Sequence, residues 1–152
     1  QHKATKMSKF AHLKKLDVAG KTAWLTLDDL EGSPKICLRY AGQSNHGYFN
    51  AMLKRSGSRN RKLLSGKVDV QMMEDNAADD RELFPIHVIT GWEGILDSKG
   101  KAVPFSRAAC TELCEALPDW VFEKIRTFAS TPERFLPEGE ELAPDGEELS
   151  KN

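Results

Sequence analysis

Apolar and polar positions alternate along residues 21–27, which places Ala23, Leu25 and Leu27 on one face of an extended chain. A period of two residues is typical of a β-strand with one buried face. A turn containing glycine and proline follows, and residues 35–40 form a second short run of this kind. The pattern predicts a β-hairpin, which must pack on later segments because two strands alone are only marginally stable.

Apolar residues spaced three and four apart predict helices after the hairpin. In residues 41–56, turn residues are followed by a helix that carries Tyr48, Met52 and Arg55 on one side. Residues 57–67 are rich in glycine, serine and basic residues, which favours a loop or a broken helix. Residues 68–73 fit neither pattern.

The segment around Trp92 predicts a helix that ends in a structural corner. Apolar residues recur at helical spacing from Leu83, and we expect the regular helix to begin there because Pro85 is tolerated only in a first turn or at a kink. Gly91 and Gly94 end or bend this helix by adopting positive φ. Trp92 then turns inward and fills the junction between this helix and the next.

Two further helices have recognisable start and stop signals. Ser106 is a favourable N-cap, and Phe105 before it is placed to contact Cys110 one turn later. That helix stops before Pro118, and we expect Asp119 to cap the next one. The predicted core consists of Trp92, Phe105, Cys110, Leu113, Cys114, Leu117, Ile125 and Phe128.

Together these patterns predict a single α+β domain, mainly helical, over residues 21–131. A short N-terminal β-hairpin packs on about four short helices in this domain. Residues 1–20 form a basic, flexible N-terminal arm. Residues 132–152 hold seven acidic residues, two basic residues and three prolines, which is typical of a flexible acidic tail.

Charge is distributed unevenly although the net charge is −1. Residues 1–67 hold fourteen Lys and Arg against four Asp and Glu, whereas residues 68–152 hold eight against nineteen. This asymmetry indicates a polyanionic partner, a complementary protein surface or head-to-tail self-association; alternatively, the two halves neutralise each other within the fold. The odd number of cysteines, Cys37, Cys110 and Cys114, favours a reducing compartment over a disulfide scaffold.

The candidate reactive residues do not form a recognisable catalytic or metal-binding pattern. Cys110 and Cys114 share one helix face, but zinc requires two further ligands with their own local spacing. We expect Glu93 to be solvated, Asp97 to shape a turn and His87 to be a core or boundary histidine. No phosphate-binding loop, nucleophile elbow or dinucleotide fingerprint is present in the sequence. We therefore expect a protein that is not an enzyme and uses no metal or other cofactor.

The basic segment 54–62 is the strongest candidate for nucleic-acid binding, because clusters of Lys and Arg bind phosphates without reading sequence. No recognised binding module surrounds it, and a solvated basic loop is the alternative. The candidate contacts, to a partner protein or to nucleic acid, are Lys54, Arg55, Arg59, Arg61 and Lys62.

The order of several weak motifs resembles a family of small tailed-phage proteins described as tail assembly chaperones or phage structural proteins. The first motif is a hairpin that contains a tryptophan and a strand ending in arginine, and the second is a turn with asparagine and aromatic residues. The third is an Arg-x-Leu pattern before a Gly-Trp pair. The fourth is an Asp…Gly…Pro-aromatic-Ser segment before a helix. They correspond here to Trp24, Arg39, Asn45, Tyr48, Phe49, Arg81, Leu83, Gly91, Trp92, Asp97, Gly100, Pro104, Phe105 and Ser106.

The resemblance implies a non-enzymatic bacteriophage morphogenesis protein. Its leading form is a tail assembly chaperone or adaptor that binds tape-measure or tail-tube protein in the host bacterial cytoplasm. The alternatives are a virion structural subunit (a head, connector or decoration protein) and, third, a nucleic-acid-binding protein that uses residues 54–62. The expected partners are other phage structural proteins, including capsid proteins, and further copies of the chain, but no membrane.

Overall fold

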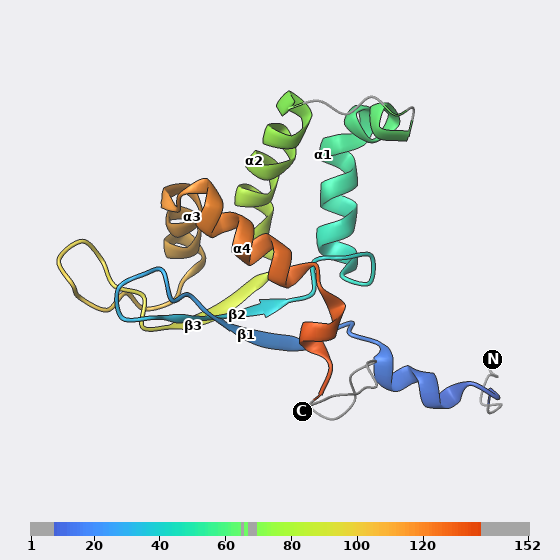
Figure 1. The fold of residues 1–152 in the computed structure, drawn as a ribbon, viewed down its shortest axis with the longest axis horizontal. Helices are drawn as coiled ribbons and strands as arrows, with labels where there is room; N and C mark the ends of the chain where they lie inside the picture. Colours follow the sequence, from blue (N-terminus) through green and yellow to red (C-terminus); the bar gives the residue numbers. More distant parts are fainter. Residues whose placement is uncertain (1–7, 65, 67–69, 138–152) are drawn as a thin grey trace, which may run out of the picture.

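The computed structural model describes residues 8–64, 66 and 70–137. In this part of the chain, helices lie over one face of a three-stranded antiparallel sheet, which confirms the prediction of a mainly helical α+β fold (Figure 1). The elements in chain order are η2 (Ala11–Leu16), β1 (Thr22–Thr26), β2 (Lys35–Arg39), α1 (His46–Leu64), α2 (Val70–His87), β3 (Ile89–Glu93), α3 (Arg107–Ala116), α4 (Asp119–Ala129) and η3 (Pro132–Phe135).

The predicted β-hairpin is confirmed as β1 and β2, which pair antiparallel with Trp24 opposite Cys37. The alternation seen in the sequence sets the two faces. Ala23 and Leu25 face the core, whereas Trp24 lies on the exposed face of the sheet. The hairpin extends to a third strand, because β2 also pairs antiparallel with β3.

The helix predicted from Leu83 to Gly91 is wrong at both ends. The helix α2 begins thirteen residues earlier, at Val70, and ends at His87, and the following residues form the strand β3. The β-branched side chains of Ile89 and Thr90 favour extended backbone, and β2 supplies a partner for the hydrogen bonds of that backbone. Pro85 consequently lies in the last turn of α2, where the helix is about to end.

In the segment 57–67, predicted to be a loop or a broken helix, residues 57–64 are helical and a kink directly precedes them. The helix α1 continues to Leu64, with non-helical dihedral angles at Ser56 (φ −104°, ψ 17°). The Ser56 hydroxyl donates to the carbonyl oxygen of Met52 at 2.8 Å, a bond from side chain to preceding turn that often bends helices. Gly57 follows directly and lowers the helix propensity of the same turn.

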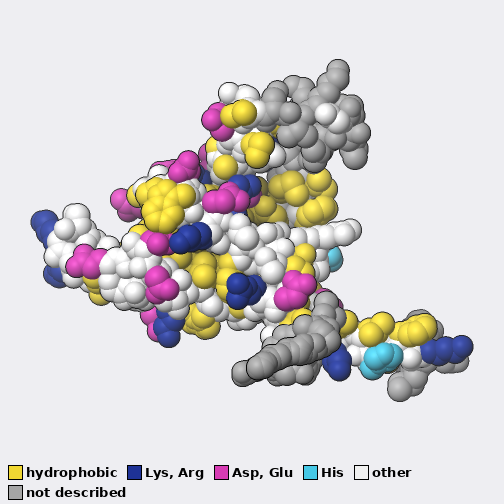
Figure 2. Space-filling view, viewed as in Figure 1, with side chains coloured by type: hydrophobic (Ala, Val, Ile, Leu, Met, Phe, Trp, Pro, Cys, Tyr) yellow, Lys and Arg dark blue, Asp and Glu magenta, His cyan; other side chains and the backbone are white. Residues whose placement is uncertain are grey.

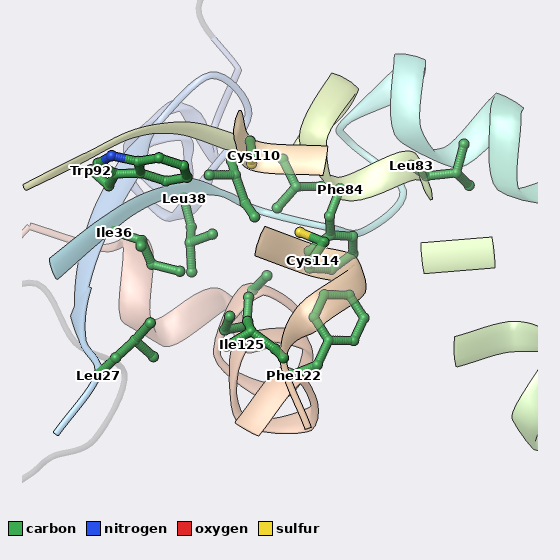
Figure 3. Packing of buried hydrophobic residues seen from close by; sticks show 14 of the residues in the cluster. Leu27, Ile36, Leu38, Leu83, Phe84, Trp92, Cys110, Cys114, Phe122 and Ile125 are labelled. Carbon is green, nitrogen blue, oxygen red and sulfur yellow. The ribbon is translucent and has the colours of Figure 1, made fainter. Parts of the chain in front are cut away.

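The core lies between the inner face of the sheet and the helices α2, α3 and α4. Aromatic rings connect the helices edge to face: Phe84 lies 5.7 Å from Tyr48 and 5.6 Å from Phe122, measured between ring centroids. Figure 3 shows sheet and helix side chains converging on this interior, among them Ile36, Leu38, Phe84, Cys114, Phe122 and Ile125.

The predicted core residues are placed as follows. The buried ones are Trp92, Cys110, Cys114, Leu117 and Ile125, and the half-buried ones that pack against them are Leu113 and Phe128. Phe105 was wrongly expected in the core, because its side chain is exposed. Its ring instead packs edge-on against Trp92, with the ring centroids 5.0 Å apart.

The two predicted helix starts differ in outcome. The Ser106 hydroxyl accepts a hydrogen bond from the backbone N–H of Ala109 at 3.0 Å, which confirms it as the N-cap of α3. Asp119 does not cap α4, because Pro118 occupies the N-cap position and Asp119 is the first helical residue. Its carboxylate still lies in the first turn, where negative charge favours the helix.

Trp92 connects the sheet to the loop that precedes α3. Its side chain is buried on β3, and its indole Nε1–H donates to the carbonyl oxygen of Val103 at 2.8 Å. Phe105 covers one edge of the ring. The predicted structural corner therefore exists, but it joins a strand to a loop instead of joining two helices.

We predict that Trp92→Ala lowers the free energy of unfolding by about 3 kcal/mol or more, because it removes a buried ring and leaves a cavity. Denaturant unfolding followed by circular dichroism measures this change. Trp24→Ala is the matched control, since it removes an exposed tryptophan from the same sheet; the expected loss is within about 0.5 kcal/mol. Equal unfolding midpoints for wild type and Trp92→Ala contradict the prediction.

The packed part of the chain continues past residue 131, where the acidic tail was expected to begin. Phe135 of η3 is buried, and its ring lies 5.9 Å from the rings of both Tyr40 and Phe128. Leu136 packs against the same cluster. Residues 138–152 of the predicted tail and residues 1–7 of the predicted arm lie outside the described residues.

We expect truncation after residue 137 to leave the midpoint of thermal unfolding unchanged. Truncation after residue 131 removes Phe135 and its two ring contacts, so it is expected to cost about 3 kcal/mol or more, the usual effect of losing a buried phenylalanine. Thermal scans of both truncated chains give the comparison. A chain ending at residue 131 that unfolds with the wild-type midpoint argues against a structural role for η3.

Candidate protein-binding surface

Two of the predicted basic contact residues are neutralised by acidic residues of α2. The Arg55 guanidinium forms an ion pair with Glu82. Arg59 forms an ion pair with Asp79, and its Nε donates to Asn76 at 2.9 Å. These contacts connect α1 to α2 and partly neutralise both guanidinium charges within the fold.

The other predicted contacts in this segment are Lys54, Arg61 and Lys62. Lys54 is exposed and has no ion pair among the described residues. Arg61 and Lys62 lie in the last part of α1, and their side chains are outside the described part of the structure.

A buried polar network joins three helices near this point. Asp80 of α2 accepts hydrogen bonds from the Tyr48 hydroxyl at 2.7 Å and from Arg126 Nε at 2.8 Å. Arg126 also donates to Glu123 at 2.7 Å. Burial raises the pKa of Asp80, against the opposing effect of its two donors, and burial followed by the nearby Asp80 carboxylate raises the pKa of Tyr48.

This network borders a hollow of about 190 Å³, also lined by Thr127 and Ser130. Both oxygens of Asp80 already accept hydrogen bonds from protein donors. Through these two hydrogen bonds Asp80 connects α1, α2 and α4.

We predict that Tyr48→Phe destabilises the protein by about 1–3 kcal/mol, because a buried carboxylate loses one of its donors. Tyr40→Phe is the matched control: it also removes a phenol hydroxyl, but the Tyr40 hydroxyl has no hydrogen-bond partner among the described residues. Chemical denaturation of the two variants compares them directly. Equal losses in both variants mean that the hydrogen bond to Asp80 contributes nothing.

The remaining candidate reactive groups each lie in a local structural setting. Asp97 accepts hydrogen bonds from two backbone N–H groups of its own turn at 2.9 Å, which confirms it as a turn former, and Glu93 is exposed as expected. Burial lowers the pKa of His87, assisted by two nearby arginines. Contact with Cys110, followed by burial, raises the pKa of Cys114, which keeps the thiol protonated.

Within the described residues, no three side chains capable of ligating a metal gather at one place. No described helix is both long enough and apolar enough to cross a membrane.

A different feature, not predicted from the sequence, collects exposed apolar side chains at one place. Val70 and Met73 at the start of α2 and Trp120 at the start of α4 are 70%, 62% and 55% exposed. They line one groove of about 770 Å³, which we call the α2–α4 surface. Its remaining lining residues are Glu74, Asn76, Ala77, Asp119, Glu123 and Arg126. Figure 2 shows hydrophobic side chains on this face at the start of α2 and near the junction of α3 and α4, with acidic side chains beside them.

The rim of the α2–α4 surface is acidic. Arg126 is its one cation among the lining residues described, and Asp80 and Glu123 neutralise that charge. Glu74 and Asp119 have no ion pair among the described residues. The surface therefore combines large apolar side chains with unneutralised carboxylates.

The helix α4 contained a partial sequence signal for this surface. Trp120 precedes Val121 and Ile125, which face the core, so helical spacing turns Trp120 outward. The part of the surface on α2 could not be predicted, because residues 68–73 showed no clear pattern. In the structure α2 begins at Val70, and this early start of the helix places Val70 and Met73 beside the groove.

Comparison with known proteins connects the chain to prophages. A family model described as YdaY prophage protein matches residues 43–143, which extend from just before α1 to beyond η3 and include the whole α2–α4 surface. No curated protein matches the chain, and no solved structure does. The match confirms the phage association implied by the order of motifs, in the coarser form of membership of a prophage family. Since the match covers more than half of the 152 residues, the chain belongs to the YdaY prophage protein family.

Proposed function

We propose that the protein is a non-enzymatic bacteriophage morphogenesis protein, a tail assembly chaperone or adaptor that binds tape-measure or tail-tube protein. Membership of a prophage family supports the phage context. The order of motifs from the hairpin to the Pro-Phe-Ser segment supports the choice of a tail assembly role over other phage functions.

The observation that carries the proposal is the α2–α4 surface. Isolated exposed apolar side chains are ordinary on soluble proteins, but several large ones around one groove mark an interaction site. Trp120 and Met73 are of the types enriched at protein interfaces, and both lie at the edge of the same hollow. A small groove of this kind fits a short segment of a partner better than a whole globular face.

The charge of the rim indicates the kind of segment that fits. Glu74 and Asp119 are open carboxylates on either side of the groove, one from each helix. A partner segment with apolar residues flanked by Lys or Arg satisfies both the groove and its rim. We therefore expect the recognised part of the tape-measure or tail-tube protein to be a basic amphipathic segment.

We predict that Met73→Glu with Trp120→Glu lowers the affinity for the tape-measure or tail-tube protein of the same prophage by about tenfold or more, because it removes both large anchors. Isothermal titration calorimetry with each purified partner measures the affinity. Trp24→Glu is the matched control, since it places the same charge on the exposed face of the sheet, away from the groove.

Both variants change exposed side chains, so their folding is expected to match that of the wild type. An affinity that is lost equally in the groove variant and in Trp24→Glu contradicts the proposed surface. Mass spectrometry of purified particles separates the two phage roles, because a chaperone is absent from mature particles and a virion subunit is present at a fixed copy number.

A further inference from the structure

The described part of the N-terminal arm, residues 8–20, exposes apolar side chains. Phe10 and Leu13 are 64% and 47% exposed, and η2 has no buried residue. In a 3-10 helix, side chains three positions apart lie along one edge, so Leu13 and the half-buried Leu16 share an edge of η2, and Phe10 occupies the N-cap position before it. Two large exposed apolar side chains on one short segment favour packing of this segment against another surface.

The charge of the arm is positive. Its described residues include Lys9, Lys14 and Lys15 against the single acidic residue Asp17, and Lys21 follows directly. None of these lysines forms an ion pair among the described residues. Figure 2 shows the arm as a projection whose hydrophobic side chains lie beside basic ones and a histidine. The arm is therefore a basic amphipathic segment, the class of segment that fits the α2–α4 surface.

We propose that the arm of one copy of this protein docks into the α2–α4 surface of a second copy. The inference rests on the proposed function in one respect, because it names an occupant for the same groove. Phe10 and Leu13 would enter the groove beside Met73 and Trp120. The arm lysines would approach the open carboxylates of its rim, among them Glu74.

The position of the arm favours docking between copies over docking within one chain. Val18 is buried and anchors the base of the arm to the body, and the Lys21 N–H donates to the Val18 carbonyl oxygen at 3.1 Å just before β1. Figure 1 shows η2 projecting from the end of the sheet, away from α3 and from the start of α2. A contact that joins the arm of one copy to the groove of the next is head to tail and uses two different surfaces.

Docking of this kind regulates the proposed function. The arm and the segment of a tail protein compete for one groove, so self-association covers the apolar surface until a partner displaces the arm. Covering the groove also limits non-specific association of Val70, Met73 and Trp120 in the absence of a partner. Removal of the arm contacts is thus expected to strengthen partner binding.

Two charge-introducing variants of the full chain test the inference. The arm variant carries Phe10→Glu and Leu13→Glu, and the groove variant carries Met73→Glu and Trp120→Glu. Sedimentation velocity over the micromolar range is expected to show association of the wild type that weakens with added salt, since the complementary charges are exposed. Each variant alone is expected to associate at least about tenfold more weakly.

Mixing the two variants supplies the decisive result. The groove variant retains an intact arm, and the arm variant retains an intact groove. The mixture is therefore expected to form a 1:1 heterodimer at concentrations at which each variant alone is monomeric. Trp24→Glu is the control and should associate as the wild type does. A monomeric wild type, association retained by either variant alone, or a mixture that stays monomeric overturns the proposal.

The outcome is independent of the test of the proposed function. If the arm variant binds the tail protein and the wild type does not self-associate, the arm inference fails and the adaptor function stands. If the variants complement each other and no tail protein binds, self-association stands and the adaptor function fails.

Discussion

The edge-to-face packing of Phe84 against Tyr48 and Phe122 determines how the helices lie. Phe84 is almost fully buried in α2, and its two neighbours come from α1 and α4. One ring thus fixes α2 against a helix on either side, and aromatic pairs of this geometry stabilise beyond the area that they bury. The α2–α4 surface depends on this packing, because Met73 and Trp120 share a groove only while the two helices keep their relative position.

The polar network beside Phe84 reinforces the same arrangement with directional contacts. Asp80 lies one helical turn before Phe84 and bonds to Tyr48 and Arg126, so it joins the same three helices that the aromatic rings join. Hydrophobic packing alone allows the helices to slide slightly past one another. Two hydrogen bonds to one buried carboxylate instead hold the three helices in a single relative position. The groove is consequently preorganised, which lowers the entropy cost of binding a segment there.

Local patterns predicted the parts of this fold that local forces decide. The alternation of residues 21–27 and the Ser106 cap act within a few residues, and both were confirmed. The strand β3 was missed because Leu83, Val88 and Trp92 also suit a helix, and only the open edge of β2 selects extended backbone there. The α2–α4 surface was missed for a related reason: its two halves are about fifty residues apart, and nothing local connects Met73 with Trp120.

Among the described residues, some of the unevenly distributed charges of the chain pair with one another within the fold, and others remain unpaired on its surface. Arg55 and Arg59 of the basic half pair with acidic residues of α2, so a portion of the asymmetry is neutralised within the fold. The arm lysines and the carboxylates of Glu74 and Asp119 have no such pairing among the described residues. Since opposite charges left open on distant surfaces of one molecule attract between copies, this remainder favours association and contributes little to folding. Salt screens exposed charges more strongly than the partly buried Arg59–Asp79 pair, so ionic strength is expected to weaken association between copies more than it weakens this internal contact.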